Sequence, residues 1–267
     1  MMYLEAKNLH FSYNGNGELL RNINLKLEGG LTILLGPNGC GKSTLLRLLS
    51  GELIPTEGKV LLNGNPIRSC KGRDRAKYVS VLLQNTLPAL DYTAEEIVTL
   101  GRSPRLPFWG PPTAKDLLQI RESMACFHVE HLANRLCNTL SGGERQRVML
   151  SSVFANEPEI LLLDEPTSAT DVAHTLLILE KLKAYSERKT VFMICHDLTL
   201  SANLADRILL MKDGSISVSG TPEEVLTEEN LKRIYDTQFS ILTSPGGKKA
   251  ILPEKRIQYR KNTLWHT

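Results

Sequence analysis

A glycine-rich segment at residues 36–43, Gly-Pro-Asn-Gly-Cys-Gly-Lys-Ser, has the residue types and spacing of a phosphate-binding loop (P-loop). It follows the apolar run 31–35 and precedes residues 44–49, which favour a helix, and such a loop requires this strand–loop–helix context. Glycines let backbone N–H groups close around phosphate oxygens, and the helix start adds partial positive charge. The Lys42 ammonium can reach the β- and γ-phosphates of a nucleotide, and the Ser43 hydroxyl can ligate Mg²⁺. The expected nucleotide-contacting residues of this segment are Gly36, Pro37, Asn38, Gly39, Cys40, Gly41, Lys42, Ser43 and Thr44.

A pair of carboxylates follows a second apolar run. Residues 160–163 are Ile-Leu-Leu-Leu, and Asp164 and Glu165 come directly after them. A carboxylate at the carboxyl end of a buried parallel strand can hold Mg²⁺ or its water ligand. Hydrolysis requires a base near the γ-phosphate, and Glu165 is the candidate for it. The alternative is that this acidic pair is only a solvated turn.

The order of the motifs resembles the ATP-binding-cassette (ABC) ATPases. After the P-loop come Gln84 behind a predicted strand, Leu-Ser-Gly-Gly at 140–143, the acidic pair, and His196 behind another apolar run. The resemblance covers about residues 2–243 and implies ATP and Mg²⁺ as cofactors. It implies that Glu165 is the general base, that His196 contacts the γ-phosphate, and that Gln84 ligates Mg²⁺ and orients water, giving Ser43, Gln84 and Asp164 as the metal ligands. The alternatives are that Gln84 is an ordinary surface residue and that His196 has a core or capping role.

The resemblance also implies that two copies of the chain act together. In ABC ATPases the Leu-Ser-Gly-Gly turn of one copy faces the ATP on the P-loop of the other, so the copies pack head-to-tail with two-fold symmetry. ATP binding is expected to close this dimer, and hydrolysis is expected to open it. The residues expected to contact the partner's nucleotide or the partner itself are Ser141, Gly142, Gly143 and Asp171.

Three further positions bear on this resemblance. Tyr13 matches the aromatic residue that stacks on adenine, with the alternative that Tyr13 or Phe11 only packs within a β layer. Glu144 stands where Gln is common after Leu-Ser-Gly-Gly, and a carboxylate suits the first turn of a helix. Thr170 stands where the family usually has Leu, a departure that concerns packing at the dimer seam rather than the reaction.

The pattern of elements predicts an α/β fold, a P-loop NTPase core with a mostly parallel sheet, an antiparallel β layer and an inserted helical subdomain. Alternating residues near the start of the chain indicate the antiparallel layer, and later apolar runs indicate parallel strands. Within the insert, residues at helical spacing should form a buried stripe. These stripe residues are Leu117, Ile120, Met124 and Phe127. We expect an ATPase domain at 1–243, with its core at 1–84 and 158–243 and its helical insert at 85–157, followed by a basic C-terminal extension at 244–267.

Composition and charge favour a soluble cytosolic enzyme over other classes of protein. The 267 residues are 42% hydrophobic and 23% charged, and no apolar run approaches the roughly 18 residues that span a bilayer. The start of the chain lacks the features of a secretory signal, and five scattered cysteines without a CxxC pair fit reduced thiols. Residues 245–267 hold six Lys or Arg and one Glu, so at a total of +3 the rest of the chain is slightly negative. Binding to nucleic acid is therefore not expected.

Residues 93–104, Thr-Ala-Glu-Glu-Ile-Val-Thr-Leu-Gly-Arg-Ser-Pro, are similar to the segment after the glutamine in ABC importers of iron–siderophore, haem and vitamin B12. Trp109-Gly110 and the segment 214–225 strengthen this likeness. It implies the ATP-hydrolysing subunit of a metal-chelate importer, peripheral at the cytoplasmic face of the inner membrane. The implied partners are a second copy, integral-membrane permease subunits and, indirectly, a substrate-binding protein. The alternatives are a soluble ABC ATPase without a transport role and an efflux ATPase, and the residues do not identify the cargo.

Two further expectations concern side-chain exposure. We expect Cys40 to be a reactive thiolate because Lys42 and a helix start lie beside it, with the alternative that its side chain points into the fold. Apolar and aromatic side chains are frequent at 85–112, where water is a poor environment for them. We expect them to dock a permease helix beside Gln84, with the alternative that they fold back onto the core of the insert. They are Leu87, Leu90, Tyr92, Leu106, Phe108 and Trp109.

Overall fold

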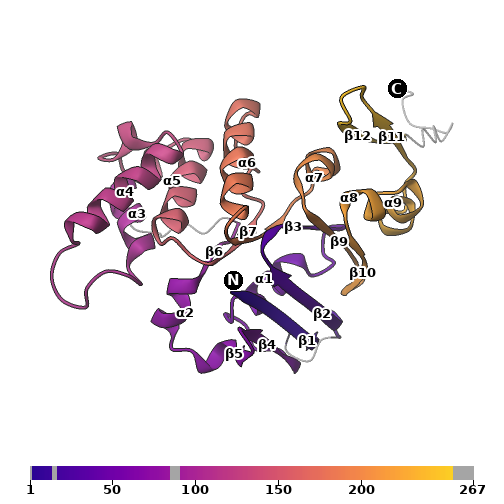
Figure 1. Ribbon diagram of the computed structural model, residues 1–267, viewed down its shortest axis with the longest axis horizontal. Coiled ribbons are helices and arrows are strands. Elements are labelled where there is room, and N and C mark those ends of the chain that lie inside the picture. The colour runs from indigo at the N-terminus through magenta and orange to yellow at the C-terminus, as the bar shows by residue number, and fades with distance from the viewer. Residues whose placement is uncertain (1, 14–16, 85–90, 255–267) are drawn as a thin grey trace, which may run out of the picture.

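A six-stranded sheet lies at the centre of the computed structural model, in the strand order β10-β9-β3-β8-β7-β6 (Figure 1). The structure describes residues 2–13, 17–84 and 91–254. All neighbouring strands of this sheet are parallel except β10, which is antiparallel to β9. The mostly parallel sheet predicted from the sequence is therefore confirmed. The strands are β3 (Gly30–Leu35), β6 (Val79–Leu82), β7 (Ile160–Asp164), β8 (Thr190–Ile194), β9 (Arg207–Lys212) and β10 (Ser215–Gly220).

Burial on both faces explains why the central strands read as continuous apolar runs. Every residue of β7 and of β8 is buried. One apolar cluster joins one face of the sheet to α1 and the antiparallel layer, and a second joins the other face to α5 (Gly142–Ala155), α6, α7 and α9. Parallel sheets are generally covered in this way because their crossover helices lie on the faces. The helices outside the insert are α1 (Lys42–Leu49), α2 (Gly72–Tyr78), α6 (Val172–Ser186), α7 (Leu198–Leu204), α8 (Pro222–Val225) and α9 (Glu228–Tyr235), and a 3₁₀ turn lies at Ile67–Ser69.

The predicted antiparallel layer is a four-stranded sheet in the order β2-β1-β4-β5. β2 alternates strictly between buried apolar and exposed polar residues over most of its length. In β1 the alternation breaks at Asn8, which has a φ of 45° and lies at a shift in the pairing register. This β-bulge turns Leu9 and Phe11 inward where a regular strand would point them out, which explains the imperfect pattern in the sequence. The strands are β1 (Tyr3–Phe11), β2 (Leu20–Glu28), β4 (Glu57–Leu62) and β5 (Asn65–Pro66).

Three helices form the described part of the predicted insert, and each begins with a capping box in which a Ser or Thr and an acidic residue satisfy each other's backbone N–H groups. The last three residues of the predicted stripe are buried, but Leu117 is 41% exposed, so the stripe prediction is wrong at its first residue. In that turn the buried side chain is Asp116, which pairs with the buried Arg102 at 2.8 Å. The elements are α3 (Ala94–Arg102), α4 (Ala114–Cys126) and α5 (Gly142–Ala155), with 3₁₀ turns at Glu130–Leu132 and Cys137–Thr139.

Two arginines cross between the core and the insert in opposite directions. Arg73, on α2 of the core, donates hydrogen bonds to the carbonyls of Pro104 and Leu106 in the loop between α3 and α4. Arg105, in that loop, donates to the Lys77 carbonyl at the end of α2, at 2.9 Å. Because Arg105 also donates to the Asn156 carbonyl and, at 3.0 Å, to the Glu157 carbonyl, the loop between α3 and α4 is bonded to its own subdomain as well as to the core.

A β-hairpin follows α9 and spans the boundary expected between residues 243 and 244. Its strands are β11 (Phe239–Thr243) and β12 (Lys249–Pro253), paired in register over five residues. Phe239 and Ile251 are buried in the same apolar cluster as α7 and α9. The first part of the expected extension is therefore paired with the segment before it, whereas its most basic part, 255–267, lies outside the described residues. No helix in the described ranges is long and apolar enough to cross a membrane.

Candidate functional site

The strand order builds the candidate site by placing four functional segments in a row. The P-loop follows β3, His196 follows β8, Glu165 follows β7 and Gln84 follows β6, and these four strands are consecutive neighbours in the sheet. Because the strands are parallel, their carboxyl ends meet at one edge, which is where α/β proteins bind ligands. One cavity of about 640 Å³ lies at this edge. It is lined by Leu19, Asn38, Gly39, Gly41, Lys42, Ser43, Thr44, Gln84, Glu165 and His196.

The P-loop has the backbone conformation that its glycines permit. Gly41 caps α1 with a φ of 103°, and a Cβ built there would lie 2.5 Å from the Leu20 side chain. A Cβ on Gly36 would lie 2.2 Å from the Met211 carbonyl oxygen of β9, so the loop starts closer to β9 than any side chain allows. The Lys42 Nζ donates to two carbonyls of the loop itself, those of residues 36 and 37, each at 2.8 Å. The ammonium therefore lies within the concavity of the loop.

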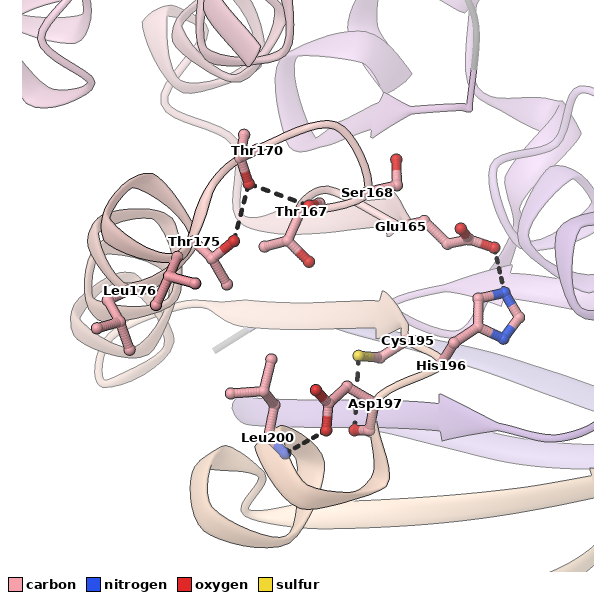
Figure 2. A pocket seen from close by; sticks show the side chains of 11 residues that line it. Glu165, Thr167, Ser168, Thr170, Thr175, Leu176, Cys195, His196, Asp197 and Leu200 are labelled. Atoms are coloured by element: carbon pink, nitrogen blue, oxygen red, sulfur yellow. Dashed lines mark hydrogen bonds and ion pairs between the residues drawn. The ribbon is translucent and has the colours of Figure 1, made fainter. Parts of the chain in front are cut away.

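Glu165 is held by the two other predicted catalytic residues. The Gln84 Nε2 donates to Glu165 Oε2 at 3.1 Å, and the His196 Nε2 bonds Glu165 Oε1. Figure 2 shows the imidazole and the carboxylate facing each other across the ends of their strands. Glu165 has a φ of 50°, and its N–H donates to the Ile194 carbonyl at 3.2 Å. A left-handed backbone at a non-glycine residue is uncommon and is concentrated at functional sites.

Asp164 has the properties of a cation ligand. Asp164 is 3% exposed, and burial raises the pKa of its carboxyl, while a hydrogen bond from Ser43 acts in the opposite direction. Asp164 Oδ1 has no hydrogen-bond partner among the described residues. A buried carboxylate oxygen left unpaired beside a serine hydroxyl suits Mg²⁺ or one of its water ligands, because the metal supplies the missing positive charge. Ser43, Gln84 and Asp164 therefore fit the predicted metal site in chemical type.

Tyr13 and Phe11 differ in their exposure to solvent. Phe11 is buried and packs within the β layer, whereas Tyr13 is 43% exposed. The two rings meet edge to face with their centroids 4.7 Å apart, and the Tyr13 hydroxyl lies 3.4 Å from Thr44 Oγ1. Tyr13 thus lies beside the start of α1 with part of its ring accessible to a base, and its stacking on adenine stays a prediction.

The Leu-Ser-Gly-Gly turn does not line the cavity at the P-loop. Ser141 caps α5, and Glu144 accepts hydrogen bonds from the N–H and the hydroxyl of Ser141, each at 2.8 Å. These two bonds lower the pKa of the Glu144 carboxyl. Glu144 thus completes a helix cap, as its place in a first turn suggested. The predicted roles of Ser141, Gly142 and Gly143 require the nucleotide of another copy.

A second cavity, of about 420 Å³, is lined on one side by Glu165 and His196 (Figure 2). Thr170 contributes to it, and its hydroxyl donates to the Thr167 carbonyl at 3.0 Å and lies 2.9 Å from Thr175 Oγ1. The hydroxyl thus gives this loop polar bonds that the Leu usual at this position cannot form. Asp171 caps α6 by accepting from the His174 N–H at 2.9 Å, and its side chain is 66% exposed. This cavity was not predicted from the sequence, although Glu165, Thr170 and His196 all line it.

The expectation of a reactive Cys40 is wrong. Cys40 is 8% exposed and belongs to the apolar cluster on the α1 face of the sheet. Burial raises the pKa of its thiol, and this effect exceeds the opposite effect of Lys42. The side chain of Cys40 points into the fold, as the alternative expected. A nucleotide on the P-loop could therefore contact only the backbone of Cys40.

The aromatic side chains of the α3–α4 loop remain in water. Phe108 is 78% exposed and Trp109 is 85% exposed, and their rings contact each other edge to face. The Arg73 guanidinium lies 5.7 Å from the centroid of the Phe108 ring. Tyr92, by contrast, packs partly against the core of the insert. Folding back onto the insert therefore does not describe Phe108 and Trp109, and Leu87 and Leu90 lie outside the described residues.

Comparison with known proteins gives consistent matches. Residues 20–168 match the family model described as ABC transporter. The chain is 34% identical to the ferric enterobactin transport ATP-binding protein FepC of Escherichia coli K12, over 94% of this chain and 93% of that protein. It is 40% identical to the hemin import ATP-binding protein HmuV of Gloeobacter violaceus, over 85% of each chain.

Two solved structures match over most of their length. An inward-facing putative metal-chelate type ABC transporter aligns with a TM-score of 0.81 and 28% identity, covering 96% of this chain and 99% of that chain. A dimeric ATP-binding cassette in a post-hydrolysis state, bound to ADP and Pi, aligns with a TM-score of 0.74 and 30% identity, covering 82% of this chain and 98% of that chain.

Proposed function

The chain belongs to the ABC transporter family, and from this premise we propose that it is the ATP-hydrolysing subunit of an importer for iron–siderophore, haem or a similar metal chelate. The observation that carries the proposal is the convergence of Lys42, Gln84, Glu165 and His196 on one cavity. The names of the relatives support the importer role, because FepC is a ferric enterobactin transport ATP-binding protein and HmuV is a hemin import ATP-binding protein.

The chemistry proposed for this cavity uses side chains that already face each other. Lys42 exchanges two neutral carbonyl acceptors for oxygens of the β- and γ-phosphates, which attract its charge more strongly. Glu165 takes a proton from the water that attacks the γ-phosphorus, and the bond between the γ-phosphorus and the bridging oxygen to the β-phosphate breaks to give ADP and phosphate. Gln84 and His196 fix the position of the base through their bonds to its two carboxylate oxygens.

The proposed metal is Mg²⁺, which would be held by Ser43, Gln84 and Asp164 and would neutralise charge on the phosphate oxygens. The unpaired oxygen of buried Asp164 supports this assignment. Removing the carboxylate should therefore weaken nucleotide binding more in the presence of Mg²⁺ than in the presence of EDTA. The Asp164→Asn variant, titrated with a fluorescent ATP analogue under both conditions, tests the assignment separately from turnover.

The proposed working unit is a head-to-tail dimer. The dimeric relative bound to ADP and Pi supports it, as does the position of the Leu-Ser-Gly-Gly turn outside this chain's own P-loop cavity. Ser141, Gly142, Gly143 and Asp171 would then face the other copy. Closure of two such interfaces by ATP and their release after hydrolysis is the proposed mechanical output.

The proposed partners place the chain at a membrane that it does not itself cross. Integral-membrane permease subunits would bind its surface at the cytoplasmic face of the inner membrane, and a substrate-binding protein would act indirectly through the permease. The metal-chelate type transporter that aligns over nearly the whole chain supports this assignment. The exposed pair of Phe108 and Trp109 is the proposed permease contact in the α3–α4 loop. Binding to nucleic acid is not part of the proposal.

Uptake measurements in cells that lack this chain test the proposal. We expect loss of uptake of one ferric siderophore or of haem, restored by the wild-type chain and not by Glu165→Gln. A matched control is Glu159→Gln, which changes a carboxylate paired with Lys189 at the opposite end of β7 from Glu165. Normal uptake of every chelate together with full ATPase activity in a soluble fraction would favour the non-transport alternative. Retention of a chelate or drug in the deleted cells would favour the efflux alternative.

A further inference from the structure

The C-terminal hairpin is bound to α7 by side chains that take the place of a neighbouring strand. The Asn203 side chain accepts from the Lys249 N–H at 2.9 Å and donates to the Lys249 carbonyl at 2.8 Å. Two residues further along β12, the Ile251 N–H donates to Thr199 Oγ1 at 2.9 Å, and the same hydroxyl lies 3.4 Å from the Ile251 carbonyl. The edge of β12 that does not pair with β11 is therefore hydrogen-bonded at both of these residues.

The spacing of these contacts explains how a helix can serve as the partner of a strand. Thr199 and Asn203 are four residues apart on α7, a rise of about 6 Å along one helix face. Lys249 and Ile251 are two residues apart on β12, a rise of about 7 Å along one strand edge. These two distances are nearly equal, so the side chains of Thr199 and Asn203 lie opposite the backbone N–H groups of Ile251 and Lys249.

α7 in turn begins at the residue after Asp197, which is bonded to His196 in the chain. Asp197 caps the helix by accepting from the Leu200 N–H at 2.8 Å, a contact drawn in Figure 2. The Asp197 carbonyl also accepts from the hydroxyl of the fully buried Ser201 at 2.6 Å. Only Asp197 separates His196 from the helix. Asp197 is held by hydrogen bonds at its carboxylate, from the Leu200 N–H, and at its carbonyl, from the Ser201 hydroxyl.

The helix that carries this connection is too short to hold its own position. α7 has seven residues, and isolated helices of this length are not stable in water. Its orientation therefore depends on what it packs against. The helix packs against the apolar cluster through Ala202, and it is hydrogen-bonded to the edge of the hairpin through Asn203. The hairpin is anchored in the same cluster by Phe239 and Ile251.

We propose that the C-terminal hairpin, acting through Thr199 and Asn203, positions His196 against Glu165. Thr199 and Asn203 are positioning residues, since neither lines the nucleotide cavity. The consequence for catalysis rests on the role proposed above for His196. The position of the His196 ring would depend on the hairpin whether or not the ring takes part in hydrolysis.

Substitution of Asn203 with measurement of the His196 ring tests the proposal. The variant Asn203→Leu removes both bonds to Lys249, and Asn203→Asp keeps the acceptor for the Lys249 N–H while losing the donor. The chain has six histidines, so ring ¹H–¹³C spectra of the nucleotide-free protein are simple, and loss of one signal in His196→Gln assigns His196. Asn230→Leu is the matched control, because it removes an amide-to-backbone bond of 3.0 Å, to the Val225 carbonyl, and the hydrogen bonds of this side chain involve α8 and α9 rather than α7.

We expect Asn203→Leu to shift the His196 signal and to lower kcat roughly three- to tenfold with KM for ATP nearly unchanged, the size that one or two lost hydrogen bonds allow. Asn203→Asp should give a smaller change of the same kind, and the control should change neither quantity. An unshifted His196 signal in folded Asn203→Leu protein would overturn the proposal. A shifted signal with unchanged kcat would support the positioning and remove His196 from the proposed reaction. If Asn203→Leu does not fold, Asn203→Asp and Thr199→Val decide by the same two measurements.

Discussion

Replacing Glu165 by Gln is the sharpest test of the proposed reaction, because it changes one oxygen of a side chain whose contacts are known. In the wild-type chain both carboxylate oxygens accept hydrogen bonds, one from Gln84 at 3.1 Å and one from His196. The amide of Gln offers one acceptor oxygen and one NH₂ group. It can therefore satisfy only one of these two donors, unless His196 changes tautomer.

Two effects of different size follow from this substitution. A mismatched hydrogen bond at a partly exposed site costs about 1 kcal/mol, or roughly a fivefold change in rate if it is expressed in the transition state. Loss of the general base costs about 10²- to 10⁴-fold, or about 3 to 5 kcal/mol of barrier. The loss of the base should dominate, so we expect turnover to fall by at least about a hundredfold while nucleotide affinity changes only a few-fold.

The assay combines ATP hydrolysis at saturating ATP with titration of a fluorescent ATP analogue. With hydrolysis blocked, light scattering should show a dimer that depends on ATP. Glu165→Asp is the informative companion variant, because it keeps the carboxylate and withdraws it by one methylene. Its turnover should lie between those of wild type and Glu165→Gln. Turnover of Glu165→Gln within a few-fold of wild type would refute the assignment of the base.

Three other predictions address separate parts of the molecule. Arg102→Leu should lower the free energy of unfolding by about 3 kcal/mol, as measured in urea, because it leaves the Asp116 carboxylate buried without its charged partner, and Arg102→Leu combined with Asp116→Leu should recover part of the loss. Cys40 should react with iodoacetamide at nearly equal, slow rates with and without MgATP, and strong protection by nucleotide would contradict its inward orientation. Trp109→Ser should reduce recovery of a tagged chain with its permease from detergent extract while basal ATPase activity stays within twofold, and equal recovery would exclude Trp109 as a docking residue.

Much of the site was predictable from the sequence because its residues lie at the ends of strands. Glu165, His196 and Gln84 each follow an apolar run, and parallel strands bring such ends to one edge of a sheet. The helix after the P-loop, expected at residues 44–49, was also close to the observed range of Lys42–Leu49. These features depend on local patterns of apolar residues, glycines and caps, which a sequence displays directly.

The features that the sequence did not reveal depend on contacts between distant residues. Cys40 points inward into an apolar cluster that also contains Leu209 and Met211 of β9, and no local pattern in the sequence records these neighbours. The first turn of α4 buries Asp116 rather than Leu117, since Arg102 of another helix supplies a charged partner. The pairing of residues 249–253 with 239–243 was missed because the prolines, glycines and lysines of this region read as an extension.

The exchange of arginines between α2 and the α3–α4 loop has a mechanical consequence. An arginine side chain can change its rotamers and keep its hydrogen bond to a carbonyl while the core and the insert rotate relative to each other. Each contact therefore restrains the distance between the core and the insert but not their relative orientation. Arg73 and Arg105 reach across the same boundary from opposite sides. Translation of the insert away from α2 would lengthen the hydrogen bonds of both arginines, whereas rotation about the line that joins the two contacts would lengthen neither. The loop that presents Trp109 is thus tied to two bodies, and a force applied at its tip is shared between the core and the insert.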